Sequence, residues 1–436
     1  MKRIIIIVLS ISIIFGFLFW KFAPNLSLFN KAKPAGPITL TYWGLWEDDN
    51  LIKPLLAEYQ SKNPNVVINY ERKSSLNYRT RVQTQAREGV GPDIFRIHNS
   101  WLPMFRNDLA PAPAEVFTLS DYKGFFYPVA ADSFTAGNQI YGAPMEVDGL
   151  ALFYNEELLA GIGGKPPKNW QEFIDLAVKM TVKDESGVKT AGAAMGTAGN
   201  VDHWSDILGL LLLQQPGVDL ANVATTQVAE VLRFYTGFVT DPKKKTWDVN
   251  LPKSTDMFAS GRLGFYFAPS WRAHELRVAN PNLKFKVAPV PQLSGKSVAW
   301  ASFWGEVVSA KSQNPTEAWK FIEYLTSAES QRSAYQQASQ IRLFGEPYSQ
   351  VSLSGELVAD PIVGAFVTQG PNYKFWYLSS NTFDNGLNDE MIKYFEDGIN
   401  AMLAGTNAST VLQTVDKGVK QVLDKYTKPA PLPSTR

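Results

Sequence analysis

The chain has 436 residues, of which 45% are hydrophobic, and this is enough for two or three domains with substantial cores. The formal net charge is only +1, so no broad positive field selects nucleic acid as a partner. Cysteine is absent, which excludes disulfides, thiolate metal sites, a cysteine nucleophile and a lipid-modified N-terminal cysteine. Aromatic residues are abundant, with 12 Trp, 17 Tyr and 26 Phe, and they either fill large cores or line a groove with flat rings.

The first element in chain order is an uncharged apolar stretch over residues 4–20, which follows Lys2 and Arg3. As a helix it would span roughly 26 Å, slightly less than the hydrocarbon core of a bilayer, which is about 30 Å thick. The residues behind it make a poor cleavage site, so we expect residues 1–22 to be an uncleaved membrane anchor, with a cleaved signal peptide as the rival interpretation. The positive charges place the N-terminus in the cytoplasm and the rest of the chain outside. Residues 23–37 are predicted to be a linker.

Strands and helices alternate in the segment that follows the linker. Residues 38–43, 66–70 and 92–97 predict strands, and residues 50–61 and 76–88 predict the helices between them. Such alternation indicates an α/β fold with a mostly parallel, doubly wound sheet. Ligands of sheets of this kind bind beyond the carboxyl ends of the strands.

The middle of the chain, from about residue 150 to 297, predicts a second unit that is rich in helices. It opens with residues 150–154, which are apolar on both faces, as expected of a strand buried on both sides. Further on, residues 298–310 predict another strand region, residues 387–426 a final pair of long helices, and residues 428–436 a flexible Pro-rich tail.

Five short motifs are informative because of their order along the chain. They are residues 40–44 (LTYWG) with 59–67; residues 91–94 (GPDI); residues 141–173, which contain a turn, a buried strand, a polar helix, a Gly/Pro loop and a helix beginning near Asn169; residues 258–262 (FASGR) with Trp271; and residues 289–291, 304–305 and 317–322. Together they resemble the bacterial extracellular solute-binding proteins, family 1, which feed sugars to ABC importers. The resemblance covers residues 38–426.

The resemblance implies a two-lobed periplasmic-binding-protein fold, in which each lobe is a mostly parallel sheet flanked by helices. The chain would cross the hinge about three times, near residues 146–149, 298–303 and 342–347. Lobe one would comprise residues 38–147 plus 300–344, and lobe two residues 148–298 plus 345–427.

Sugars present C–H patches on their ring faces and hydroxyls around the rim, so their binding sites combine flat apolar rings with planar polar groups. Candidates of both kinds follow the predicted strands or lie at the hinge crossings: Trp43, Trp46, Glu47, Asn99, Trp101, Glu146, Asp148, Trp204, Trp271, Trp304 and Arg342. For the tryptophans the alternative is core packing, and for Glu146 and Asp148 it is a solvated turn or hinge hydrogen bonds. For His203 and Arg272 we favour structural roles, at a helix start and in a surface ion pair.

The function that the resemblance implies is that of a monomeric extracytoplasmic receptor, tethered through residues 4–20. It would bind a carbohydrate, in particular an oligosaccharide, by hinge closure and deliver it to the transmembrane subunits of an ABC importer. No cofactor, metal or catalytic residue is expected, since the three histidines lack ligand spacing. Two alternatives remain: the same fold binding a non-sugar solute, and a secreted glycosidase, for which Glu146 and Asp148 are the pair to test.

Overall fold

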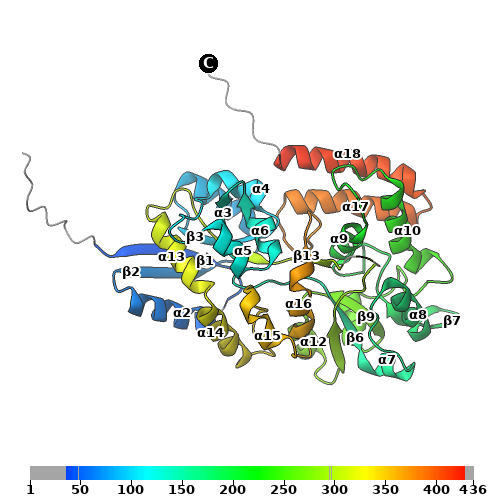
Figure 1. Ribbon diagram of the computed structural model, residues 1–436. Coiled ribbons are helices and arrows are strands. Elements are labelled where there is room, and N and C mark those ends of the chain that lie inside the picture. Colours follow the sequence, from blue (N-terminus) through cyan, green and yellow to red (C-terminus); the bar gives the residue numbers. More distant parts are fainter. Residues whose placement is uncertain (1–35, 48, 294, 296, 428–436) are drawn as a thin grey trace, which may run out of the picture.

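The computed structural model of the chain describes residues 36–47, 49–293, 295 and 297–427. These residues form two lobes that lie side by side, each built on its own β-sheet with helices packed around it (Figure 1). The predicted two-lobed α/β fold is thus confirmed. The predicted anchor over residues 1–22, the linker up to residue 35 and the tail over residues 428–436 lie outside the described residues. Within the described ranges, no helix combines the length and the apolar composition that crossing a bilayer requires.

The sheet of lobe one has four strands in the order β12, β3, β1, β2. Their bounds are Ile38–Gly44 for β1, Val66–Arg72 for β2, Ile94–His98 for β3 and Trp304–Val308 for β12. β1 pairs in parallel with both β2 and β3, whereas β12 pairs antiparallel with β3. The sheet is therefore mostly parallel, as predicted, and its register sets Trp304 opposite His98 at the carboxyl end of β3.

Helices surround this sheet, with α2 packed on β2, α13 on β12 and α14 on α2. The elements of this region are α2 Asp49–Lys62, α3 Tyr78–Glu88, α4 Leu102–Phe105, η1 Arg106–Asp108, α5 Leu119–Phe125, α6 Pro128–Phe134, β4 Thr135–Ala136, β5 Gln139–Ile140, α13 Pro315–Leu325 and α14 Ala328–Ser339. The faces of β1, α2 and α13 that meet here are apolar and form a core of their own.

The sheet of lobe two has five strands in the order β10, β6, β9, β8, β7. Their bounds are Ala151–Asn155 for β6, Val182–Asp184 for β7, Gly187–Ala193 for β8, Leu263–Ala268 for β9 and Phe285–Ala288 for β10. Only β8 and β9 pair in parallel. The expectation of a mostly parallel sheet is therefore wrong for this lobe. That expectation came from the family resemblance, and the apolar pattern of β6 could not correct it, because this pattern indicates burial on both sides without fixing strand direction.

Side-chain caps mark the starts of some helices of lobe two. At the start of α8, Asn169 accepts a hydrogen bond from the backbone N–H of Glu172 (2.9 Å) and donates one to its carboxylate (2.9 Å), which confirms the predicted helix start. The remaining elements are α7 Glu156–Gly161, α8 Trp170–Met180, α9 Trp204–Gln214, α10 Thr226–Thr240, α11 Ser254–Ala259, α12 Arg272–Ala279, β11 Ala299–Trp300, η2 Val351–Leu353, α15 Ser354–Leu357, α16 Val363–Gln369, η3 Gly370–Asn372, β13 Tyr373–Lys374, α17 Leu387–Leu403 and α18 Ala408–Tyr426.

The chain passes between the two lobes three times, and the first crossing lies against both of the others. Leu150 N–H donates to the carbonyl of Trp300 in the second crossing (2.9 Å), and Val147 N–H donates to the carbonyl of Pro347 in the third (3.1 Å). Gly149 stands between these contacts, where a Cβ would lie 1.9 Å from the Trp300 carbonyl oxygen. The backbones can approach this closely only because residue 149 has no side chain.

A buried carboxyl group ties the first crossing to lobe two. Asp148 accepts hydrogen bonds from the hydroxyl of Ser270 (2.8 Å), from the backbone N–H of Ser270 (3.1 Å) and from that of Gly149 (2.7 Å). Burial raises the pKa of Asp148 to about 7, and these hydrogen bonds limit the rise.

Substituting Gly149→Ala is expected to lower the free energy of unfolding by about 1–3 kcal/mol, since the new methyl group forces the first two crossings apart. Urea denaturation measures the change. The matched control is Gly124→Ala in α5, where a Cβ would meet no atom within 4 Å, and this helix substitution should be neutral or stabilising by up to about 1 kcal/mol. Equal effects of the two substitutions would contradict the close-approach explanation.

Asp148→Asn should gain stability relative to the wild type as the pH rises. The folded-state pKa of about 7 lies above the ordinary value of 3.8, so the folded protein binds more protons than the unfolded chain between those values. In this window Asp148 makes the free energy of unfolding fall with increasing pH, and a non-titrating amide removes that slope. Urea unfolding of the wild type and of Asp148→Asn in pH steps from about 4 to about 8 measures this slope. A difference in the free energy of unfolding between the two proteins that does not change with pH would contradict the explanation.

Candidate functional site

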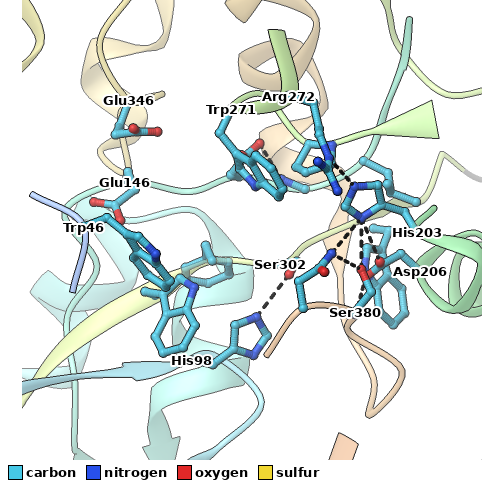
Figure 2. A pocket seen from close by; sticks show the side chains of 18 of the residues that line it. Trp46, His98, Glu146, His203, Asp206, Trp271, Arg272, Ser302, Glu346 and Ser380 are labelled. Atoms are coloured by element: carbon cyan, nitrogen blue, oxygen red, sulfur yellow. Dashed lines mark hydrogen bonds and ion pairs between the residues drawn. The ribbon is translucent and has the colours of Figure 1, made fainter. Parts of the chain in front are cut away.

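A cavity of about 520 Å³ lies between the lobes, beside the three crossings (Figure 2). Its walls come from the end of β1, from all three crossings, from the starts of α9 and α12, and from the loop before α17. The residues that line it are Trp46, Glu47, Arg96, His98, Glu146, Asp148, Gly149, Leu150, His203, Asp206, Pro269, Trp271, Arg272, Glu275, Trp300, Ser302, Phe303, Trp304, Arg342, Glu346, Ser380, Asn381 and Phe383.

Seven of the eleven predicted site residues line this cavity. They are Trp46, Glu47, Glu146, Asp148, Trp271, Trp304 and Arg342. The other four, Trp43, Asn99, Trp101 and Trp204, do not line it.

Trp101 and Asn99 are fully buried behind the wall of the cavity. The Trp101 ring stacks on Phe105, with centroids 5.9 Å apart, and lies 4.9 Å from the Trp304 ring. Asn99 accepts a hydrogen bond from the backbone N–H of Phe303 (3.1 Å). Neither side chain reaches the cavity, because the chain turns from β3 into α4, where Trp101 joins the hydrophobic core and Asn99 bonds to the backbone.

Trp43 and Trp204 are excluded from the cavity for different reasons. β1 extends one residue past Trp43, so this side chain lies on a face of the sheet, buried, with the ammonium of Lys73 4.1 Å from its ring centroid. Trp204 starts α9 and packs against the core of lobe two.

Lobe one contributes a supported row of rings to the cavity. Trp46 is 50% exposed, and its ring meets the edge of Trp304 at a centroid distance of 4.8 Å. Trp304 is held from behind by Trp101 and at its side by His98, 5.2 Å away. The exposed indole of Trp46 is therefore held in position by Trp304, whereas a tryptophan at a strand end without such contacts could rotate.

Lobe two contributes Trp271 and His203, for which the sequence favoured a structural role at a helix start. The guanidinium of Arg272 lies 4.3 Å over the Trp271 ring, and its Nε donates to Nε2 of His203 (3.1 Å). Because Nε2 accepts, the ring proton of His203 is on Nδ1, which faces the hydroxyl of Ser380 at 2.9 Å (Figure 2). Arg272 also pairs with Glu275 at 2.5 Å, the structural role expected of it.

An ion cluster buried under the cavity floor centres on Arg96. Its guanidinium contacts the carboxylates of Glu306 (2.7 Å), Glu146 (3.3 Å) and Glu47. Burial raises the pKa of both Glu146 and Glu306, and the Arg96 charge opposes this rise. Arg96 was missed in the sequence, yet an arginine in the middle of the apolar β3 was the signal, since such a charge needs partners.

The loop over residues 380–385 was also missed. Three of its residues other than glycine have positive φ, namely Asn381 (58°), Phe383 (48°) and Asn385 (45°). Phe383 is 58% exposed and lines the cavity. The Asn/Asp/Gly-rich sequence around one phenylalanine was the available signal, because these residues tolerate the left-handed conformation.

The loop is fixed to both lobes. Ser380 N–H donates to the carboxylate of Asp206 in α9 (3.1 Å). Arg79 of α3 donates from Nε to the carbonyl of Asp384 (2.7 Å), and the buried Asp384 carboxylate accepts from the N–H of Gly386 (2.9 Å). The strained backbone around Phe383 is therefore held from both sides.

Comparison with known proteins agrees with this architecture. The sequence pattern of the family described as bacterial extracellular solute-binding protein matches residues 55–365, well over half of the chain. A Brucella abortus (strain 2308) protein, whose name describes it only as a binding protein, is 23% identical to this chain over 279 residues, which are 61% of this chain. The chain spans 66% of that relative's own length.

Two further similarities concern proteins named for sugars. The maltooligosaccharide ABC transporter solute-binding lipoprotein of Streptococcus pneumoniae serotype 4 is 23% identical over 256 residues, which are 54% of this chain and 56% of the relative. The solved structure of the sugar-binding protein MalE from Xanthomonas citri superposes with a TM-score of 0.72 at 20% identity, covering 89% of this chain and 98% of that one. With the two-lobed fold and the family match, the conclusion is that this chain belongs to the bacterial extracellular solute-binding proteins.

Proposed function

We propose that this protein is an extracytoplasmic receptor that binds a carbohydrate, an oligosaccharide in particular, between its lobes and delivers it to the transmembrane subunits of an ABC importer. The observation that carries the proposal is that Trp46 and Trp304 from lobe one and Trp271 from lobe two line a single cavity. The names of the Streptococcus and Xanthomonas proteins support the same ligand class.

The cavity offers the two kinds of surface that a sugar needs. An indole that covers one face of a sugar ring contributes roughly 1–2 kcal/mol from apolar area alone. The carboxylates and guanidinium groups around Trp46 and Trp271 provide planar, bidentate partners for hydroxyls. A solute without hydroxyls at the right places would leave these buried polar groups unpaired, so they provide specificity.

The proposed mechanism is closure about the three crossings. We assign residues 38–147 and 300–344 to lobe one and residues 148–298 and 345–427 to lobe two, so that the hinge lies at the contacts around Gly149. A ligand that touches Trp46 and Trp271 at once gains its full contact only when the lobes close, and it shifts the equilibrium by this difference in affinity. The importer would then recognise the closed form.

A non-catalytic role fits the environment of the two carboxyl groups that a glycosidase would need. Glu146 faces Arg96, and Asp148 is held by Ser270 and Gly149. We also propose that the protein is a monomer outside the cytoplasm and that residues 4–20 attach it to the membrane. These points rest on the apolar N-terminal sequence and on the family.

A thermal-shift screen against a glycan library tests the proposal. A true ligand raises the melting temperature progressively with concentration, because it binds only the folded protein. We expect the hits to be carbohydrates. Hits confined to amino acids, peptides or metal ions would replace the sugar receptor by a receptor for another solute on the same fold.

Removing the rings should weaken binding of a sugar found in that screen. Trp271→Ala and Phe383→Ala are each expected to raise Kd by roughly 5- to 30-fold, which corresponds to about 1–2 kcal/mol of lost apolar contact. Calorimetry measures the affinity. The matched control is Phe125→Ala in α5, because this phenylalanine is also half-exposed, at 47%, but does not line the cavity. An unchanged Kd for Trp271→Ala would remove lobe two's ring from the site.

A further inference from the structure

Carboxyl groups outnumber cations around the cavity. Six side chains of aspartate and glutamate line it: Glu47, Glu146, Asp148, Asp206, Glu275 and Glu346. Only three arginines do so: Arg96, Arg272 and Arg342. The chain as a whole has no such excess, since its formal net charge is +1.

Each of the three arginines already has a carboxylate partner. Arg342 pairs with Glu346 at 2.7 Å, Arg272 pairs with Glu275 at 2.5 Å, and Arg96 is shared among three glutamates. The charge of each arginine is therefore matched by a carboxylate, while Nε of Arg342 is still a buried donor without a partner among the described residues and can serve a ligand hydroxyl.

On lobe two, Asp206 is a cavity-lining carboxylate that pairs with none of the three arginines. Its side chain is only 3% exposed, and Oδ1 accepts hydrogen bonds from the indole N–H of Trp300 (2.8 Å) and from Ser380 N–H (3.1 Å). Oδ2 has no hydrogen-bond partner within the described part of the chain, and the closest approach of the His203 ring is Nδ1 at 3.5 Å. A buried carboxylate oxygen without a donor is costly, so this atom favours a ligand that supplies one.

The position of Asp206 is fixed by packing. Gly209, one turn further along α9, faces the Trp300 ring, where a Cβ would come within 2.2 Å of a ring carbon. The Trp300 ring therefore packs closely against α9, and its indole N–H holds Oδ1 of Asp206, which leaves Oδ2 without a donor among the described residues.

Lobe one presents a second free acceptor. Glu47 pairs with Arg96 through Oε1, while its Oε2 is buried without a hydrogen-bond partner among the described residues. Trp46, its neighbour, and Trp271 across the cavity add ring faces that attract a cation. Each lobe therefore offers an acceptor oxygen and an aromatic ring to the same cavity.

From this arrangement we propose that the carbohydrate bound by this protein carries a protonated amino group, which donates to Oδ2 of Asp206 as the lobes close. The inference rests on the proposed function and narrows its substrate class to amino sugars. An ammonium group supplies three donors and a positive charge beside the carboxylates of Asp206 and Glu47, whereas a hydroxyl supplies one donor and no charge. An acidic sugar would place another negative charge beside these carboxylates and is rejected.

Matched sugar pairs that differ only in an amine or a hydroxyl test the inference. Calorimetry at about pH 6, where a sugar amine is protonated, compares glucosamine with glucose, galactosamine with galactose, and the β-1,4-linked glucosamine tetramer with cellotetraose. The amino member of a binding pair should have about tenfold lower Kd, because a hydrogen bond to a charged group is stronger than a neutral one.

Variants locate the effect. Asp206→Asn should reduce the preference for the amine towards parity, and Glu47→Gln, at a more accessible side chain, gives a second reading if the first variant does not fold. The control is Asp397→Asn, which makes the same charge change on the exposed surface of α17. It should leave the preference unchanged.

The outcomes separate the inference from the function on which it rests. Neutral sugars that bind as tightly as their amino counterparts, or uronic acids that bind more tightly, overturn the amino-sugar inference and leave the sugar receptor intact. A preference for the amine that survives in both cleft variants also overturns it. If no carbohydrate of the library binds, the proposed function fails together with the inference.

Discussion

The close approach of two backbones at Gly149 is the constraint on which the cleft depends. The first crossing pairs with the other two on either side of this residue, and a single Cβ would collide with the Trp300 carbonyl. Because the three crossings are packed this tightly, the residues that flank them, Glu146 and Asp148 on one and Trp304 on another, converge on one cavity. The hinge therefore both joins the lobes and builds the floor of the candidate site.

Charged side chains below and beside the cavity also fix the geometry of the candidate site. Arg96 is buried with three carboxylates, an arrangement that costs desolvation of every member and is compensated only by good geometry. Two of these carboxylates, Glu47 and Glu146, also line the cavity, so the cluster fixes part of the polar wall. With Asp206 on the opposite lobe, carboxyl groups line both sides of the cleft, an arrangement that the near-neutral composition of the chain does not reveal.

Sequence patterns predicted the elements that depend on local chemistry and missed those that depend on distant contacts. The start of α8 was predictable because Asn169 caps its own helix. The contact between Arg96 and Glu306 joins residues 210 positions apart, and no local pattern indicates it. Trp43 and Trp46 are three residues apart, yet one lies inside the sheet and the other in the cleft, since β1 continues one residue further than predicted. The prediction of mostly parallel strands in lobe two came from the family resemblance and was wrong, and local patterns could not correct it, because burial on both faces is compatible with either strand direction.

Closure of the two lobes on a ligand can be measured as a change in the distance between them. The chain contains no cysteine, so introduced cysteines can be labelled specifically. Leu76 and Val278 are highly exposed residues on opposite lobes, so Leu76→Cys and Val278→Cys together give a pair of sites for spin labels. Pulsed electron resonance then reports the distance between the lobes with and without the best glycan from the screen. If the lobes close, a saturating glycan should replace the distance distribution of the free protein by a different, narrower one. A distribution that stays unchanged when the glycan is fully bound would contradict hinge closure.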